Sequence, residues 1–334
     1  MKKTRKLILV NLILLGIIFA LLESGARVLI YLTRGRSTAG QPERLQYLSY
    51  RPFVMFGPDF DVRLDESRQS AGDDAFRVLL VGGSTAAGFG EHILESALTE
   101  AYRGCRVDVI NAAAGGYNAR QELIVASIWG PGLQPDLLLS LDGANDLIHR
   151  LRMTEAGTFF LNVGYESLFK RPLLSWLVHI LRSSQFVYGV QRLGQRRSVG
   201  LIESYVDAIP VFVSAQHSLN VLARGLSATR MMVLQPHMSF KRPLSDAEAG
   251  FTNYAYREQV VKALYDLTHT ELGALAASDD VLYLDARPIF DGMGETVFSD
   301  DVHFVDDRGY EILSRHIART GDIVPPNHPA CSSQ

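Results

Sequence analysis

The sequence predicts an α/β protein built on a doubly wound, parallel five-stranded sheet. Five short runs are continuously apolar rather than alternating, which is typical of strands that are covered on both faces. Segments with helical periodicity separate these runs, and strands that alternate with helices form parallel sheets. The predicted strands are residues 77–81, 107–111, 136–141, 230–235 and 281–285.

Apolar side chains at helical spacing mark the helices between these strands. A last helix is expected after Asp306 and Asp307, because acidic side chains favour a helix N-terminus. The predicted apolar faces comprise Ile93, Leu94, Ala97 and Leu98, then Val260, Val261, Leu264 and Leu267, and finally Tyr310, Leu313 and Ile317.

Residues 1–33 are predicted to form a transmembrane helix that anchors the chain in the inner membrane. Basic residues at positions 2–6 precede an uncharged run from Leu7 to Leu22. A basic flank marks the cytoplasmic end of a membrane segment, although this run is shorter than the ~20 residues that span a bilayer. The alternative is a signal peptide cleaved near residues 24–26. Either interpretation places the remaining chain in the periplasm or outside the cell.

The rest of the chain divides into a linker at 34–74, a globular domain at 75–322 and a tail at 323–334. An insertion at 148–228 is aromatic and basic in its first half. It is interpreted either as a cap over the strand ends or as a helical excursion with a solvated basic face. The two cysteines, Cys105 and Cys331, either form a disulfide or remain free thiols.

The composition sets limits on the function. The chain has 334 residues, of which 47% are hydrophobic and 21% are charged, and its net charge is −3. These values are those of a globular protein with additional apolar sequence. The charge, and the lack of a basic tail or Cys/His array, argue against nucleic acid as a partner.

Ser84 is a candidate nucleophile. It follows the apolar run of the first strand and two glycines, Gly82 and Gly83. Glycines permit a tight turn from a strand into a helix, and a serine that opens such a turn exposes its hydroxyl group. Gly-Gly-Ser-Thr is also a common turn and helix cap, so Ser84 alone is a weak signal.

Gly116 and Asn145 are candidate oxyanion donors together with the backbone amide of Ser84. Both follow predicted strands, and the carboxyl ends of parallel strands form the ligand-binding edge of such sheets. A glycine lets its backbone amide approach a substrate, and an asparagine side chain donates without ionising. Asn145 also lies in Gly-Ala-Asn-Asp, where asparagine is favoured as a turn residue.

His303 is a candidate general base, oriented by a nearby carboxylate. The local sequence offers Asp300 and Asp301 as partners for its second ring nitrogen. His303 is one of nine histidines, and a single histidine is more often structural than catalytic. The Asp300 and His303 pair alone does not make a metal site, so neither a metal site nor a cofactor is predicted.

Four sequence blocks, around Ser84, Gly116, Asn145 and His303, follow one another in this order. Together they resemble the SGNH/GDSL hydrolase family of esterases, lipases and acyl-carbohydrate esterases, in a membrane-anchored bacterial form. The resemblance covers residues 77–318 and implies a flavodoxin-like fold. It implies a catalytic triad of Ser84, Asp300 and His303, and an oxyanion hole formed by Ser84, Gly116 and Asn145.

The chain departs from the family pattern at two positions. Gly83 replaces the usual aspartate before the serine, and Ala113 stands where the second block often has a glycine. The first departure is compatible with a catalytic role, because it occurs in a subgroup of the family. The second departure concerns the geometry of the loop that carries Gly116.

The resemblance implies a serine esterase that hydrolyses an ester of a lipid or of an acylated cell-surface carbohydrate through an acyl-enzyme. One alternative is an O-acyltransferase, in which a hydroxyl group of an extracellular polysaccharide replaces water. Another is a non-catalytic binding module on the same fold. The predicted partners are therefore an ester substrate and the membrane, without nucleic acid.

Overall fold

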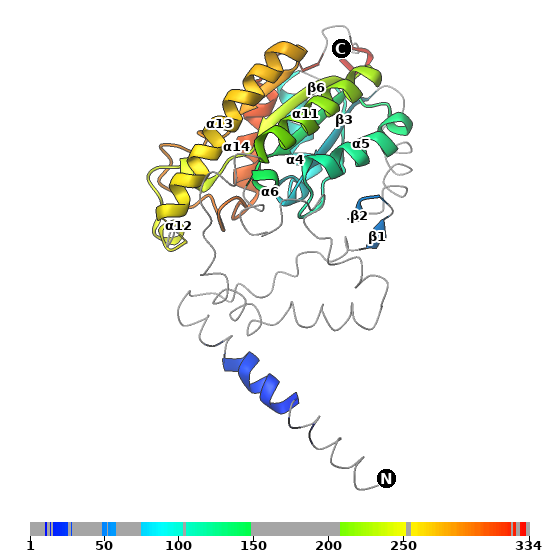
Figure 1. Cartoon of the computed structure of the whole chain (residues 1–334). Coiled ribbons are helices and arrows are strands. Elements are labelled where there is room, and N and C mark those ends of the chain that lie inside the picture. The colour runs from blue at the N-terminus through cyan, green and yellow to red at the C-terminus, as the bar shows by residue number, and fades with distance from the viewer. Residues whose placement is uncertain are drawn as a thin grey trace, which may run out of the picture. The chain divides into compact units, whose positions relative to one another are not determined.

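The computed structural model (Figure 1) describes most of the α/β domain and parts of the N-terminal region. The described residues are 11, 14, 16–25, 28, 49–51, 53–57, 75–102, 105–147, 208–251, 255–321, 323–324 and 328–331. The chain divides into two compact units, residues 1–46 with 164–199 and residues 47–163 with 200–334.

The second unit is built on the five-stranded parallel sheet that the sequence predicts. The strands lie in the order β4-β3-β5-β6-β7 and all neighbours are parallel. The strand β3 comes first in sequence among these five, and it lies between β4 and β5, which come second and third. This order creates a topological switch point between β3 and β5. The strands are β3 (Phe76–Gly82), β4 (Val107–Asn111), β5 (Leu137–Asp142), β6 (Thr229–Leu234) and β7 (Leu282–Asp285).

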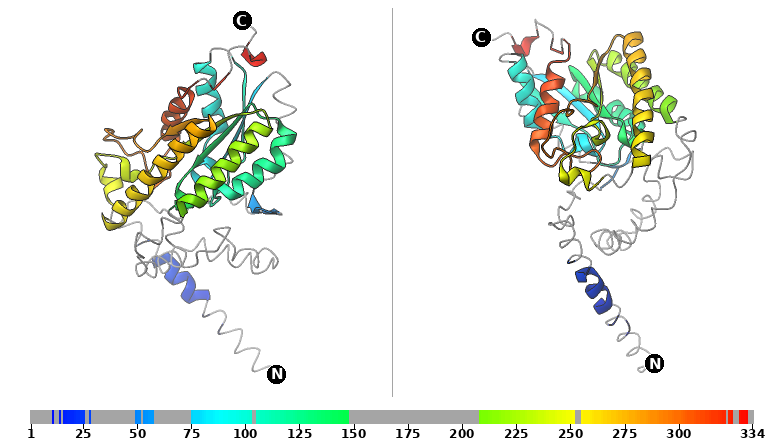
Figure 2. Two further views of the ribbon diagram at one scale, coloured as in Figure 1. Left: turned by 45° about the horizontal axis from the view of Figure 1, so that its top comes forward. Right: turned by 90° about the vertical axis from the view of Figure 1, so that its left-hand side faces the viewer.

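Helices cover both faces of this sheet, as Figure 2 shows. One face is covered by α4 (Glu91–Ala101) and α14 (Asp307–Ala318), which pack against each other. The other is covered by α5 (Ala119–Leu133), α11 (Ala208–Gly225) and α13 (Ala255–Asp279), with α11 in contact with both neighbours. Short helical segments follow several strands: α3 (Ser84–Ala87), α6 (Ala144–Leu147), η5 (Met238–Phe240) and α12 (Asp246–Ala249).

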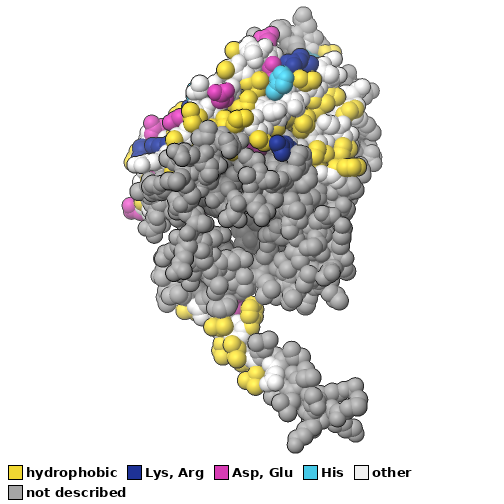
Figure 3. Space-filling model, viewed as in Figure 1, with side chains coloured by type: hydrophobic (Ala, Val, Ile, Leu, Met, Phe, Trp, Pro, Cys, Tyr) yellow, Lys and Arg dark blue, Asp and Glu magenta, His cyan; other side chains and the backbone are white. Residues whose placement is uncertain are grey.

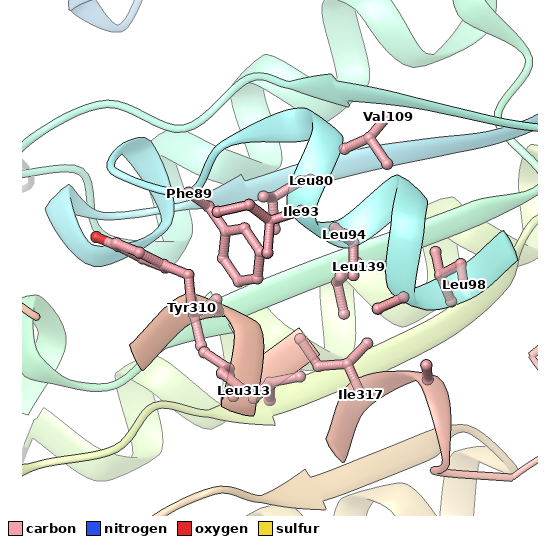
Figure 4. Packing of buried hydrophobic residues seen from close by; sticks show 14 of the residues in the cluster. Leu80, Phe89, Ile93, Leu94, Leu98, Val109, Leu139, Tyr310, Leu313 and Ile317 are labelled. Atoms are coloured by element: carbon pink, nitrogen blue, oxygen red, sulfur yellow. The ribbon is translucent and has the colours of Figure 1, made fainter. Parts of the chain in front are cut away.

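The core divides into two layers because strand side chains alternate between the faces of the sheet. Leu80 and Leu139 point to the α4 and α14 side, where they meet Leu94 and Leu313 (Figure 4). Met232 and Leu234 belong instead to the layer under α11 and α13. All of these side chains are buried, which accounts for the continuously apolar strand sequences.

One predicted core position on α13 is wrong. Leu267 is 48% exposed, whereas Thr268 is fully buried and its hydroxyl donates to the carbonyl of Leu264 at 2.8 Å. Both positions lie within the i+3 and i+4 spacings from Leu264, so periodicity alone does not separate them. Thr268 enters the core because the carbonyl one turn earlier satisfies its hydroxyl.

The helix α11 lies inside the stretch 148–228 that we predicted as a helical insertion or cap. Its buried face includes Ile209, Phe212 and Leu219, and it packs on α5, α13 and β6. Residues 148–207, with the predicted basic and aromatic half, lie outside the described residues.

A buried polar cluster fixes the end of β5. The Gln216 side-chain amide donates to Asp142 at 2.7 Å, and Arg230 donates to Gln216 at 2.6 Å and to Ser140 at 2.8 Å. Burial lowers the pKa of Arg230 to about 10, although Asp142 and Glu122 oppose the shift. Burial, followed by the charge of Asp142, raises the pKa of Glu122 well above its ordinary value. The cluster therefore immobilises β5 just before the loop that carries Asn145.

The C-terminal tail is bound at the amino ends of the strands, opposite the carboxyl ends that precede Ser84 and Asn145. Cys105 and Cys331 form a disulfide, one of the two alternatives that the sequence left open. The amide of Arg106 donates to the carbonyl of Ala330 at 3.1 Å, and His328 contacts Asp136 at 3.1 Å. Arg106 directly precedes β4 and Asp136 directly precedes β5, so the tail lies away from the carboxyl ends of the strands.

The predicted anchor at 1–33 and linker at 34–74 lie largely outside the described residues. Residues 16–25 are helical, and Ile17, Ile18 and Leu21 are at least half exposed. Figure 3 shows hydrophobic side chains on the surface of this helix. Within the described ranges, no helix has both the length and the apolar character needed to cross a bilayer. In the linker, β1 (Ser49–Arg51) and β2 (Met55–Gly57) form an antiparallel pair.

We expect the disulfide to stabilise the domain, because it restricts the unfolded chain over a separation of 226 residues. The double variant Cys105→Ser/Cys331→Ser should lose about 2–5 kcal/mol of unfolding free energy. Denaturant unfolding with and without a reductant measures this loss. Reduction should bring the wild type to the stability of the variant and leave the variant unchanged. Equal stability of oxidised and reduced wild type would contradict the expectation.

Candidate active site

The candidate site lies at the carboxyl ends of β3 and β5, at the switch point of the sheet. Ser84 is the first residue of α3 and directly follows the turn after β3. Gly82 in this turn has φ +158°, and a Cβ atom there would lie 2.4 Å from the Ala86 side chain and 2.7 Å from the Leu141 carbonyl oxygen. Only glycine fits this position, so the sharp turn that presents Ser84 depends on it.

Ser84, His303 and Asp300 form one chain of hydrogen bonds. The Nε2 atom of His303 lies 2.7 Å from the Ser84 hydroxyl oxygen, across 219 residues of sequence. Its Nδ1 atom lies 2.7 Å from an Asp300 carboxylate oxygen. The structure thus brings together the three residues predicted as nucleophile, base and orienting acid. Asp301, the other acid beside His303, contributes its carbonyl to a backbone hydrogen bond from Met238 at 2.9 Å.

The Asp300 carboxylate is held in its ionised form. Its second oxygen accepts the backbone amides of Val302 at 2.9 Å and His303 at 2.8 Å. Partial burial raises the pKa of Asp300, but the hydrogen bond and charge of His303 and these two amides outweigh it, so the pKa lies below its ordinary value. Asp300 is therefore an acceptor at neutral pH and fixes the imidazole from one side.

Asn145 lies in α6, immediately after β5, and its side chain is buried. Its Nδ2 atom donates to the carbonyl of Tyr117 at 2.7 Å. A Cβ atom on Gly83 would lie only 2.3 Å from the same nitrogen. The side-chain amide of Asn145 thus occupies the space that any side chain at position 83 would need. This packing explains why glycine stands at position 83, beside Ser84.

Gly116 lies in the turn formed by residues 115–116 after β4, and its φ of +83° favours glycine. The amide of Ala114 donates to the carbonyl of Gly82 at 3.2 Å, which ties this loop to the turn before Ser84. A Cβ atom on Gly115 would lie 3.9 Å from the Ser84 Cβ atom. The loop therefore passes directly beside the candidate nucleophile.

Asn111, the buried last residue of β4, contacts both loops of the site and was not among the predicted site residues. Its side-chain amide donates to the carbonyls of Ala86 at 2.8 Å and Phe89 at 3.1 Å. Its side-chain oxygen accepts the amide of Ala113 at 3.0 Å. Asn111 thus joins the segment after Ser84 to the loop of Gly116. An asparagine at the carboxyl end of a predicted strand is the sequence signal that could have identified it.

Thr85 is a second residue beside the site that was not predicted from the sequence. Its hydroxyl lies 3.4 Å from the carbonyl of Val302 and 3.4 Å from the side-chain amide of Gln235. Thr85 thus connects the segment of Ser84 to the loop of His303. Across the part of the chain that the structure describes, no group of three or more His, Cys, Asp or Glu side chains is placed to hold a metal ion.

No known protein family matches the chain, and no curated protein matches it either. Several solved structures are similar to it. An acetylxylan esterase from Geobacillus stearothermophilus, Axe2, shares 15% identity at a TM-score of 0.43, over 73% of this chain and 92% of that chain. A gut microbial diltiazem-metabolizing enzyme shares 12% identity at a TM-score of 0.45, over 73% of this chain and 46% of that chain.

We expect Gly83→Ala to impair the site, because the new methyl group would displace the Asn145 side chain. If Asn145 is an oxyanion donor, its loss lowers the rate about 10²–10³-fold. Labelling of Ser84 by a fluorophosphonate, followed over time, measures this rate. Gly273→Ala is the control, since its Cβ atom would meet nothing within 4 Å in α13. Wild-type labelling by Gly83→Ala would show that the packing of Asn145 is irrelevant to the site.

Proposed function

We propose that this protein is a serine esterase that hydrolyses a carboxylic ester through an acyl-enzyme intermediate. The observation that carries the proposal is the hydrogen-bonded chain from Asp300 through His303 to Ser84, with 2.7 Å at each step. A hydroxyl group becomes a nucleophile when an adjacent base removes its proton and a third group orients that base.

We infer from the hydrogen bonds that Nε2 of His303 acts as the base. The ionised carboxylate of Asp300 only accepts hydrogen bonds, so Nδ1 of His303 carries the proton. In the neutral ring, Nε2 then has a free lone pair directed at the Ser84 hydroxyl. His303 takes the proton as the Ser84 oxygen attacks the ester carbonyl, and Asp300 stabilises the imidazolium that forms.

Three donors are proposed to stabilise the oxyanion of the tetrahedral intermediate: the backbone amides of Ser84 and Gly116 and the Asn145 side chain. The hydrogen bond from Asn145 to Tyr117 occupies one of its two amide hydrogens and orients the other. Such donors are fixed before the reaction and stabilise the charge as it develops.

The proton on His303 then passes to the leaving alcohol, and the acyl group remains on Ser84. A water molecule, deprotonated by the same imidazole, attacks the acyl-enzyme and releases the acid. Each step uses the same proton path, so the three side chains act as one unit.

We further propose a lipid or an acylated cell-surface carbohydrate as the substrate, and a periplasmic or extracellular location for the domain. The uncharged run from Leu7 to Leu22 after a basic flank supports a single-pass anchor in the inner membrane. The Cys105–Cys331 disulfide is typical of an oxidising compartment. Fractionation and N-terminal sequencing of the mature protein test the location, and a mature protein that begins beyond residue 33 would exclude the anchor.

We expect Ser84→Ala to abolish ester hydrolysis while leaving the fold intact, because the nucleophile is lost. His303→Ala and Asp300→Asn should lower kcat by about 10⁴-fold or more. The effects should not add in double variants, since the residues act as a unit. Hydrolysis of short and long acyl esters and of acetylated sugars, with circular dichroism as the folding control, measures these losses. Full turnover by purified Ser84→Ala would refute the mechanism.

Product analysis with and without a polysaccharide acceptor identifies what receives the acyl group. Hydrolysis predicts free acid in both reactions, with the same yield. Acyl transfer to the sugar would reassign the protein as an O-acyltransferase with the same Ser84 chemistry. Failure of a fluorophosphonate to label the wild type would indicate a non-catalytic binding module.

A further inference from the structure

A buried ion pair lies in the segment between β6 and α13. The Nζ atom of Lys241 is 2.7 Å from a carboxylate oxygen of Glu248, and the two side chains are 1% and 0% exposed. Burying two charges costs free energy that their mutual attraction seldom exceeds, and apolar residues of similar volume often serve stability as well. The pair therefore calls for an explanation beyond packing.

The Glu248 carboxylate accepts four hydrogen bonds. One oxygen accepts from Lys241 and from the amide of Ser245 at 2.9 Å. The other accepts the amides of Val297 at 2.9 Å and Phe298 at 3.0 Å. Burial raises the pKa of Glu248, but these bonds outweigh it and lower the pKa to about 2. A full negative charge thus holds two consecutive amides of a distant segment.

These two amides stand at the base of the loop that carries the acid and base of the candidate site. Phe298 forms an antiparallel bridge with Phe304, and the amide of Ser299 donates to the carbonyl of His303 at 2.8 Å. The loop is therefore short and closed on itself. Asp300 is only two residues beyond Phe298, so movement at the base of the loop would move Asp300 and His303 as well.

The same segment also holds the tip of the loop. The amide of Met238, at the start of η5, donates to the carbonyl of Asp301 at 2.9 Å. The loop is thus attached to residues 238–248 at its base through Glu248 and at its tip through Met238. Lys241 lies between these attachments and donates to the carbonyl of Pro243 at 2.9 Å as well as to Glu248.

We propose that Glu248, neutralised by Lys241, is a positioning residue that aligns His303 with Ser84. It touches none of the reacting groups and acts by fixing the amides of Val297 and Phe298. The inference rests on the proposed esterase function for its kinetic consequence. Its structural consequence, the placement of the His303 ring against Asp300, is independent of any substrate.

The first test is Glu248→Gln. A glutamine side chain has one acceptor oxygen and an NH2 group that only donates, so it loses the bonds either to Lys241 and Ser245 or to Val297 and Phe298. We expect kcat to fall about 10²-fold with KM unchanged, because a displacement near 1 Å costs that much. Asp246→Asn is the matched control: it makes the same change on an exposed residue of α12 and should behave as wild type.

A second variant, Lys241→Met/Glu248→Met, keeps the volume of the pair without its charges. It separates positioning from stability, because an apolar pair leaves no buried charge uncompensated. If Glu248 positions the loop, this variant unfolds cooperatively but still has a lowered kcat, since the amides of Val297 and Phe298 have lost their acceptor. A folded double variant with wild-type kcat would overturn the proposal.

Proton NMR provides a readout that needs no substrate. The Nδ1 proton of His303, bound to the Asp300 carboxylate, should give a downfield signal that is absent in His303→Ala. This signal should shift or broaden in Glu248→Gln and stay unchanged in Asp246→Asn. An unchanged signal in folded Glu248→Gln would overturn the proposal. If the wild type hydrolyses no ester, the esterase proposal fails, and the NMR comparison still decides the role of Glu248.

Discussion

The site depends on the meeting of two segments that lie 219 residues apart in the sequence. The hydrogen bond between His303 and Ser84 forms only if the turn after β3 and the loop before α14 reach the same edge of the sheet. A parallel sheet makes this possible because all of its strands end at one edge. The polar contacts of Thr85, Met238 and Glu248 then fix the loop of His303 on that edge. The fold supplies the meeting point, and these contacts supply the alignment.

Close backbone approach is the second requirement of the site. Gly82 and Gly83 lie against the Leu141 carbonyl and the Asn145 side chain, at distances that exclude a Cβ atom. The two glycines therefore do more than bend the chain before Ser84. They let the ends of β3 and β5 approach so closely that the Asn145 side chain packs against Gly83, the residue before Ser84.

The sequence predicts the five strands because their signals are local. Ser84 and His303 are weak candidates when each is taken alone, and the choice of Asp300 over Asp301 rests on the resemblance to a known family. Continuously apolar runs mark the strands, and each chemical group stands at a strand end or before a helix. Such local patterns do not reveal the hydrogen-bond partners of Asn111, Arg230 and Glu248. Their roles depend on carbonyls and amides that are distant in sequence, and nothing local marks which backbone group a buried polar side chain will meet. Thr268 illustrates the same difficulty within one helix turn.

The location of the C-terminal tail has a practical consequence. The disulfide from Cys105 to Cys331 holds the tail where the strands begin, and Arg106 and His328 reinforce this attachment. A fluorescent reporter or a surface linker fused after residue 334 would leave the chain on the side of the domain away from Ser84. Immobilisation through the tail would therefore hold the domain by the end of the sheet where the strands begin, opposite the strand ends that carry Ser84.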